Sequence, residues 1–108
     1  MTLLLNQEEF EILLGRVPTE KPIPPLVVLY FTASWCKACK KLDLPLIQAT
    51  VPKATWMKCD IDQNDYTAGF CGIRSIPTFL VIRETKLMGQ LSNSNTETVV
   101  EWLKRFAE

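Results

Sequence analysis

Residues 26–40 read LVVLYFTASWCKACK, and this stretch is the most informative part of the 108-residue chain. Its first six residues, Leu26 to Phe31, are continuously apolar and rich in strand-favouring side chains. Such a run is typical of a strand buried on both faces of a central sheet. Two cysteines separated by two residues, Cys36 and Cys39, follow at once. We therefore expect a buried strand that leads into a helix, with the two sulfurs close enough to bridge.

The segment before this strand is expected to hold a short strand and one helix. Leu3 to Leu5 predict the strand, and apolar residues at helical spacing predict an amphipathic helix over 7–17. Asn6 is expected to cap this helix, with Glu9 as its capping-box partner. The four prolines between residues 18 and 25 exclude a helix there and indicate a connector.

The segment after the strand is expected to alternate helices and strands. The cysteine-bearing helix should run from about 36 to 50, with a kink at Pro45, because an interior proline removes a backbone hydrogen bond. The remaining elements are strands at 55–61, 78–82 and 86–91, a helix at 64–71, and a last helix capped by Ser94 and Glu97. The order is β-α-β-α-β-α-β-β-α, which predicts an α/β fold with helices covering a sheet.

Length and composition indicate one globular domain, residues 1–108. The chain is 47% hydrophobic and 22% charged, as ordinary globular proteins are. Twelve basic and twelve acidic residues cancel, which argues against a nucleic-acid partner. The sequence contains no histidine, so the commonest general base and metal ligand is absent.

The N-terminus does not resemble a secretory signal. It is apolar from Met1 to Leu5 but turns acidic at Glu8 and Glu9, without the basic segment and long apolar run of a signal peptide. No stretch is long enough to cross a bilayer. We expect a cytoplasmic protein with no membrane association, although a targeting segment removed earlier would leave the same sequence. In a reducing compartment, a close cysteine pair is more often catalytic or metal-binding than structural.

The cysteine pair is suited to thiol–disulfide exchange. The attacking species is a thiolate, which a helix N-terminus and the neighbouring Lys37 and Lys40 would stabilise. Cys36 is expected to be the more exposed, attacking sulfur. Cys39 would then resolve the mixed disulfide. A pair with this spacing beside a βαβ pattern is a known signature of redox proteins.

A metal site is the competing interpretation of the cysteines. Cys59 and Cys71 could complete four thiolate ligands for zinc or an iron–sulfur cluster. They are not spaced as a second pair, and each lies in an apolar stretch where a free cysteine packs as a small hydrophobe. Redox chemistry is therefore favoured, with no metal and no cofactor beyond a redox-active Cys36–Cys39 disulfide.

Three separated motifs together resemble the thioredoxin family. They are Phe31-Thr32-Ala33-Ser34-Trp35-Cys36, Asp60-Ile61-Asp62-Gln63-Asn64 and Gly72-Ile73-Arg74-Ser75-Ile76-Pro77-Thr78. The similarity includes Lys58 and Gly89, and the order of elements fits over essentially the whole chain. The resemblance implies a thioredoxin fold, with a central mixed β-sheet flanked by helices.

The resemblance also implies roles for individual residues. Cys36 would be the attacking thiolate and Cys39 the buried resolving thiol. Pro77 would be a cis-proline facing the cysteines, with Ile76 offering backbone hydrogen bonds to an extended substrate. Trp35, Ile73 and Gly89 would border a shallow apolar docking surface.

The family also implies the partners. Electrons would come from a flavoprotein that resembles thioredoxin reductase, or from a ferredoxin-linked counterpart, and would pass to protein disulfides. We expect a monomer.

The sequence departs from the family pattern around the active site. Lys37-Ala38 replaces the usual Gly-Pro between the cysteines, a position that tunes the reduction potential. Tyr30 replaces a buried aspartate that assists deprotonation of the resolving thiol in the family. Lys58 thereby loses its usual partner, and we expect Asp60, two residues along the same strand face, to be able to substitute.

Two further features differ from the common pattern. The hairpin between Ile82 and Gly89 is shorter than usual and lacks a glycine turn. Cys71 matches a position where some animal thioredoxins carry a regulatory cysteine. We interpret it as structural, because half-buried free thiols are usually inert.

The leading functional hypothesis is a dithiol reductase of protein disulfides. The replacement by Tyr30 favours an alternative, a non-catalytic interaction module or a redox relay dedicated to one partner, whereas the intact cysteines argue against loss of catalysis. The opposite direction, a thiol oxidase, is also open, because Lys37 and Lys40 could stabilise the thiolate enough to make the disulfide oxidising.

Overall fold

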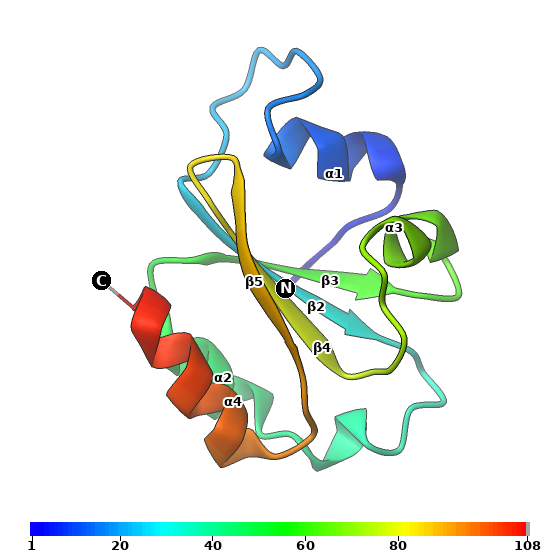
Figure 1. Ribbon diagram of the computed structural model, residues 1–108, viewed down its shortest axis with the longest axis vertical. Helices are drawn as coiled ribbons and strands as arrows, with labels where there is room; N and C mark the ends of the chain where they lie inside the picture. The colour runs from blue at the N-terminus through cyan, green and yellow to red at the C-terminus, as the bar shows by residue number, and fades with distance from the viewer. Residues whose placement is uncertain (108) are drawn as a thin grey trace.

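The computed structural model describes residues 1–107 and contains a five-stranded sheet in the order β1-β3-β2-β4-β5 (Figure 1). Strands β1, β3 and β2 pair in parallel, whereas β4 pairs antiparallel with both β2 and β5. The strands are β1 (Thr2–Leu3), β2 (Leu26–Thr32), β3 (Thr55–Asp60), β4 (Thr78–Arg83) and β5 (Lys86–Ser92). The sheet is mixed, as expected.

Strand β2 is the centre of the molecule because it contributes to both hydrophobic cores. Every residue from Leu26 to Thr32 is buried. Side chains of a strand alternate between the two faces of a sheet. Val28 and Tyr30 accordingly join one core, while Leu29 and Phe31 join the other.

The helices cover the two faces of the sheet in pairs (Figure 1). Helices α1 (Gln7–Leu13) and α3 (Asp65–Phe70) lie on one face, and α2 (Leu44–Thr50) and α4 (Thr96–Leu103) lie on the other. Two 3-10 turns complete the structure, Cys39–Lys41 and Lys104–Phe106. No helix among residues 1–107 is both long and apolar enough to cross a membrane.

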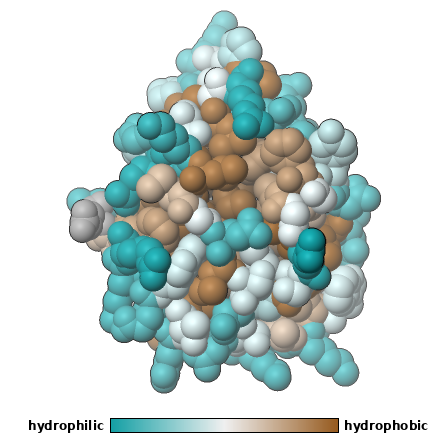
Figure 2. Space-filling model, in the orientation of Figure 1, coloured by the Kyte–Doolittle hydropathy of each residue, from teal (hydrophilic) through white to brown (hydrophobic). Residues whose placement is uncertain are grey.

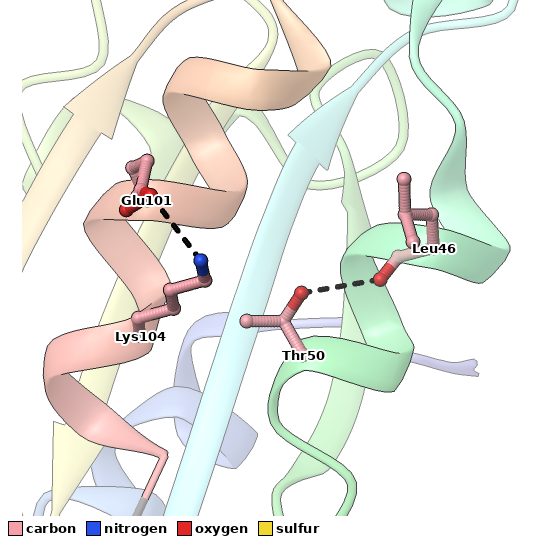
Figure 3. A network of polar contacts seen from close by, with 4 residues as sticks. All are labelled: Leu46, Thr50, Glu101 and Lys104. Carbon is pink, nitrogen blue, oxygen red and sulfur yellow. Dashed lines mark hydrogen bonds and ion pairs between the residues drawn. The ribbon is translucent and has the colours of Figure 1, made fainter.

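The exposed sides of α2 and α4 carry short-range polar contacts (Figure 3). On α2, the Thr50 hydroxyl donates to the carbonyl oxygen of Leu46 over 3.2 Å. At the end of α4, the ammonium group of Lys104, the first residue of the following 3-10 turn, lies 3.2 Å from a carboxylate oxygen of Glu101. Exposed pairs of this kind contribute little to stability, so packing against the sheet is what holds these helices.

Most of the expected elements are confirmed, with small shifts at their ends. Asn6 caps α1 by accepting the Glu9 N–H over 2.9 Å, and Glu9 returns a bond to the Leu5 N–H. The helix ends at Leu13 instead of residue 17, because Gly15 takes a positive φ of 72° that a helix cannot continue through. The first strand covers Thr2–Leu3 instead of residues 3–5.

The prediction of one kinked helix over 36–50 is wrong. The chain instead forms the 3-10 turn Cys39–Lys41 and then starts α2 afresh at Leu44. Pro45 lies in the first turn of α2, where the missing N–H would have no intrahelical partner anyway. The Asp43 side chain caps this helix by accepting the Leu46 N–H over 3.2 Å.

The last helix begins one residue later than expected. Its cap is Asn95, whose side-chain oxygen accepts the N–H of Thr98 over 2.9 Å, and not Ser94. Its predicted apolar face is confirmed by Val99 and Leu103, which are both fully buried.

The outer surface is not uniformly polar. Figure 2 shows apolar surface gathered in the middle of the face that Figure 1 presents, with hydrophilic side chains around it. Two side chains of the edge strand β5, Leu87 and Met88, are about half exposed.

Candidate active site

The two cysteines are joined to each other directly after the central strand. Cys36 and Cys39 form a disulfide, with 5.3 Å between their Cα atoms. The turn that follows β2 holds Cys36 in place, because its N–H donates to the carbonyl oxygen of Ala33 over 3.1 Å. The expectation that these two sulfurs can bridge is therefore confirmed.

The electrostatic setting of the pair differs from the expected one. Both cysteines are buried in the oxidised protein, Cys36 at 4% and Cys39 at 6% exposure, so their burial does not distinguish the attacking sulfur from the resolving one. No α-helix begins at Cys36, since α2 starts only at Leu44, so a helix dipole contributes less than expected. The Cys39 N–H instead donates to Cys36 Sγ over 3.0 Å. This contact favours negative charge on Cys36 in preference to Cys39.

The segment Ser75–Thr78, which is distant from the cysteines in the sequence, lies against the disulfide. The peptide bond between Ile76 and Pro77 is cis, as the resemblance implied. The carbonyl oxygen of Ile76 lies 3.9 Å from Cys36 Sγ. The buried Thr78 hydroxyl anchors the segment by donating to the carbonyl oxygen of Ser75 over 2.6 Å.

An apolar groove borders the disulfide, and we call it the Trp35 groove. It encloses about 300 Å³ and is lined by Trp35, Ile61, Ala68, Ile73, Arg74, Ser75 and Ile76. Trp35 is 61% exposed, and its indole N–H donates to the carboxylate of Asp62 over 2.8 Å. Three predicted docking residues, Trp35, Ile73 and Ile76, thus meet in one place.

Gly89 does not belong to this groove, and its predicted role is corrected. It pairs with Val81 in the middle of the hairpin and faces Trp102 of α4. The residues that adjoin Pro77 are Ser92 and Asn93. Ser92 pairs with Thr78, and the Asn93 N–H donates to the Pro77 carbonyl over 3.3 Å. The pairing of β4 with β5 shifts its register between Val81 and Ile82, so the residue opposite Pro77 and Thr78 could not be read from the sequence motif alone.

A second cavity also touches the cysteines, and we call it the lysine cavity. It encloses about 290 Å³ and is lined by Tyr30, Thr32, Ala33, Ser34, Cys36, Cys39, Lys40, Leu42, Leu44 and Lys58. The predicted supporting residues Tyr30, Lys40 and Lys58 therefore lie together beside both sulfurs. Lys37 is exposed and lines neither space.

Asp60 does not take the place expected of it. Its carboxylate accepts the N–H of Asp62 over 2.9 Å, within the turn that follows β3. It does not line the lysine cavity, and residues 1–107 contain no ion pair between Asp60 and Lys58. The prediction that Asp60 substitutes for the family's buried carboxylate is therefore not supported.

Tyr30 is buried in the core and is one of the residues that line the lysine cavity. It is 3% exposed, its ring stacks on Phe79 with 5.1 Å between centroids, and it lies opposite Lys58 on the neighbouring strand. Burial raises the pKa of the Tyr30 phenol, an effect that the Thr32 hydroxyl partly opposes. The phenol is therefore protonated at neutral pH and is no substitute for a carboxylate base.

The other two cysteines are free and unreactive. Burial raises the pKa of Cys59 to about 12, with smaller contributions from Cys71 and Asp60, and burial raises the pKa of Cys71 to about 11. Both thiols are therefore neutral at physiological pH. Within the described part of the chain, His, Cys, Asp and Glu side chains form no cluster of three or more that could hold a metal ion.

Comparison with known proteins gives a consistent result. A family model described as thioredoxin matches residues 2–105. The mitochondrial thioredoxin-3 of Saccharomyces cerevisiae is 30% identical over 107 residues, which covers 96% of this chain and 78% of the yeast protein. The thioredoxin of Chlorobaculum thiosulfatiphilum is 41% identical over 69 residues, covering 60% of this chain and 63% of that protein.

Solved structures of thioredoxins have the same fold as this chain. The crystal structure of oxidised mitochondrial thioredoxin 3 from S. cerevisiae superimposes with a TM-score of 0.80 at 29% identity, covering 97% of this chain and 94% of that one. The thioredoxin of Fasciola hepatica gives a TM-score of 0.79 at 26% identity, covering 97% and 98% of the two chains.

Proposed function

This chain belongs to the thioredoxin family and is a thiol–disulfide oxidoreductase, and on that premise we propose that it reduces protein disulfides, with Cys36 attacking and Cys39 resolving. The observation that carries the assignment of roles is the Cys39 N–H aimed at Cys36 Sγ over 3.0 Å. This donor stabilises a thiolate on Cys36 and offers nothing comparable to Cys39.

The reaction uses only the protein's own sulfurs. In the reduced protein, the Cys36 thiolate attacks one sulfur of the substrate disulfide. A bond forms between these two sulfurs, the substrate S–S bond breaks, and the departing sulfur leaves as a thiolate that takes a proton from water. Cys39 then loses its proton and attacks Cys36 Sγ, which closes the protein disulfide and releases the second substrate thiol. Two electrons pass from the protein to the substrate.

The Trp35 groove is suited to hold the polypeptide that carries the substrate disulfide. Its walls are largely apolar, and Ile76 presents its carbonyl oxygen 3.9 Å from Cys36 Sγ. An extended peptide could therefore bond to the Ile76 backbone while its cysteine sulfur meets Cys36. Asp62 keeps the exposed Trp35 ring in position by accepting its indole N–H.

The proposal includes the chain's partners and location. The oxidised protein would be reduced by a thioredoxin-reductase-like flavoprotein or by glutathione, and it would act as a monomer. A reductase needs a compartment that returns its disulfide to the dithiol, and the cytoplasm is such a compartment.

The assignment is tested by reducing insulin with the pre-reduced protein. Wild type should reduce the insulin disulfides, Cys36→Ser should abolish the reaction, and Cys39→Ser should accumulate a mixed disulfide that mass spectrometry detects. A mixed disulfide that accumulates in Cys36→Ser instead would exchange the two roles. A folded wild-type protein that reduces no disulfide would overturn the proposal.

The direction of the reaction is tested by equilibrating the protein with glutathione. A reductase should lie on the reducing side of the glutathione couple. A strongly oxidising equilibrium would instead assign the protein to disulfide formation, since Lys37 and Lys40 would then stabilise the thiolate more than expected.

A further inference from the structure

The lysine cavity adjoins the reacting sulfurs, yet the proposed mechanism does not use it. It shares no residue with the Trp35 groove. Besides the two cysteines, the residues that line it include three that carry hydroxyl groups, Tyr30, Thr32 and Ser34, and two lysines, Lys40 and Lys58. No carboxylate lines it. The cavity therefore combines positive charge with hydrogen-bond donors, a combination that suits an anion.

The nearby carboxylates are engaged elsewhere. Asp60 accepts the Asp62 N–H, Asp62 accepts the Trp35 indole N–H, and Asp43 accepts the Leu46 N–H at the start of α2. The ion pair found within residues 1–107 joins Lys104 to Glu101 on α4. Neither Lys40 nor Lys58 is therefore neutralised by an acidic side chain of the described chain.

The position of the cavity determines which anion it can meet. Cys36 contributes to its wall, so a substrate sulfur bonded to Cys36 lies at its edge. Groups attached within a few bonds of that sulfur can reach Lys58 or Lys40. In a polypeptide, such a group is an acidic side chain next to the cysteine. In a small disulfide, it is a carboxylate on the same short chain as the sulfur.

We propose that the lysine cavity binds a carboxylate of the disulfide substrate, so that the protein prefers substrates with an acidic group close to the reacting sulfur. This inference deepens the proposed function and rests on it. The cavity selects among substrates, whereas the Trp35 groove and the two cysteines suffice for disulfide exchange itself.

The test uses three small disulfides that differ in charge and share a two-carbon arm on each sulfur. They are 3,3′-dithiodipropionate, which is anionic, 2-hydroxyethyl disulfide, which is neutral, and cystamine, which is cationic. The second-order rate constant of the pre-reduced protein is measured with each. We expect the rate constants to fall in that order, after correction for the intrinsic reactivity of each compound with dithiothreitol.

Two variants identify the cavity as the source of the preference. Lys58→Gln and Lys40→Gln should each lower the ratio of the anionic to the neutral rate constant by about two- to fivefold, as expected for a partly exposed charge pair. Using a ratio cancels any change in the reactivity of Cys36 itself. Lys41→Gln is the matched control, because it removes the same charge from the adjacent position without lining the cavity.

The possible outcomes separate this inference from the proposed function. Equal corrected rates for all three compounds, or a ratio that Lys41→Gln lowers as much as Lys58→Gln does, would overturn the cavity's role while leaving disulfide reduction intact. Failure to reduce any of the compounds would instead contradict the proposed function.

Two disulfide-linked peptides, with Glu or Gln beside the cysteine, distinguish the source of the carboxylate. A preference for the Glu peptide that Lys58→Gln removes supports the inference for polypeptide substrates. A preference confined to the small compound supports it for small carboxylate disulfides only.

Discussion

Tyr30 and Cys39 line the same cavity, so the Tyr30 side chain bears on the proposed second half of the reaction, the deprotonation and attack of Cys39. It lies in the wall of the lysine cavity beside Cys39, opposite Lys58 on β3. Burial raises the pKa of its phenol, so it cannot accept a proton at neutral pH. No carboxylate lines the cavity, so the Cys39 proton has no carboxylate base there. We infer that resolution is slower here than in relatives with a buried carboxylate at this position.

Replacing Tyr30 by aspartate should therefore accelerate resolution of the mixed disulfide. A positioned base typically contributes a factor of about 100 or more, and partial misplacement should leave about tenfold. The change also removes the stack on Phe79 and buries a carboxylate, so the variant should be less stable. Single-turnover kinetics measure the resolution step. Tyr30→Phe is the control and should change the rate less than about twofold; a large loss in that variant would show that the hydroxyl participates.

Titration of the two free thiols should make the free energy of unfolding depend on pH, and only in the alkaline range. Cys59 and Cys71 titrate in the folded protein with pKa values of about 12 and about 11, both raised from 9.0. Because the folded state binds these protons more tightly, the stability they contribute is complete below pH 9 and is lost as pH rises through the folded-state values.

The free energy of unfolding should therefore decrease between about pH 9 and pH 12. Urea titrations across this range measure the decrease, and the double variant Cys59→Ala and Cys71→Ala should make it smaller, while the part due to Tyr30, whose pKa burial also raises, remains. In the native protein at pH 7.5, iodoacetamide should modify neither thiol before unfolding. Rapid labelling of the folded protein at that pH would contradict the assignment of both thiols as unreactive.

At the scale of elements, the β4–β5 hairpin shows a local conflict between sequence and structure. Arg83 pairs with Lys86, which leaves a two-residue turn at Glu84 and Thr85. These residues adopt positive φ angles of 49° and 66°. Tight hairpins of this kind favour Asn-Gly, whereas a β-branched residue at positive φ is strained. The Thr85 side chain lies over Gly15, 3.3 Å from where a Cβ on that glycine would be, and its loss would offset part of any gain from relieving the strain.

The double change Glu84→Asn and Thr85→Gly should stabilise the protein by about 1 kcal/mol. The gain comes from relief of backbone strain, and part of it is offset by the loss of the Thr85 contact with Gly15. Urea unfolding of the oxidised protein measures the change. Thr85→Ala serves as the comparison, since it removes the contact and keeps a side chain at positive φ. A double variant less stable than wild type would mean that the contact outweighs the strain.

Local sequence patterns predicted the elements well where one signal dominated. The run Leu26 to Phe31 and the apolar strand Thr78–Arg83 could be recognised from composition alone, and Asn6 was recognised as a cap. The cysteine helix was predicted incorrectly because Pro45 is compatible with both an interior kink and a first-turn position. In the structure, the cap at Asp43 and the 3-10 turn at Cys39–Lys41 place Pro45 in the first turn of α2.

At the scale of the whole molecule, both cores depend on the central strand. Leu29 is fully buried in the core beneath α1 and α3, and β2 joins this core to the one beneath α2 and α4. Truncating a side chain of β2 should therefore destabilise the whole fold. Truncation on the edge strand β5 should cost less stability, since Leu87 is 52% exposed.

Leu29→Ala should lower the free energy of unfolding by about 2–5 kcal/mol, because the surrounding core cannot collapse fully around the space left behind. Leu87→Ala is the matched substitution on the exposed edge and should cost less than about 0.5 kcal/mol. Chemical denaturation followed by circular dichroism compares the two. Similar losses at both positions would contradict the dominant role of β2.

The candidate site was predictable in part. Trp35, Ile73, Ile76 and Pro77 were identified because they belong to continuous motifs. The structure places Trp35, Ile73 and Ile76 around one groove, and it places the Ile76 carbonyl next to Cys36 Sγ. Gly89 was assigned wrongly, because the register in which β5 pairs with β4 depends on the turn that Glu84 and Thr85 form. The role expected of Asp60 finds no support, because sharing a strand face with Lys58 does not determine where a side chain finds its hydrogen bond.

The sequence by itself determined the α/β layering, the central strand and the closeness of Cys36 and Cys39, because these depend on periodicity and on separations of a few residues along the chain. The tertiary structure alone decided which groups from distant segments meet at the sulfurs. The Ile76 carbonyl, Lys58 and the buried Tyr30 become neighbours of the sulfurs only when the sheet pairs in its observed register, since packing, and not local preference, brings these distant segments together.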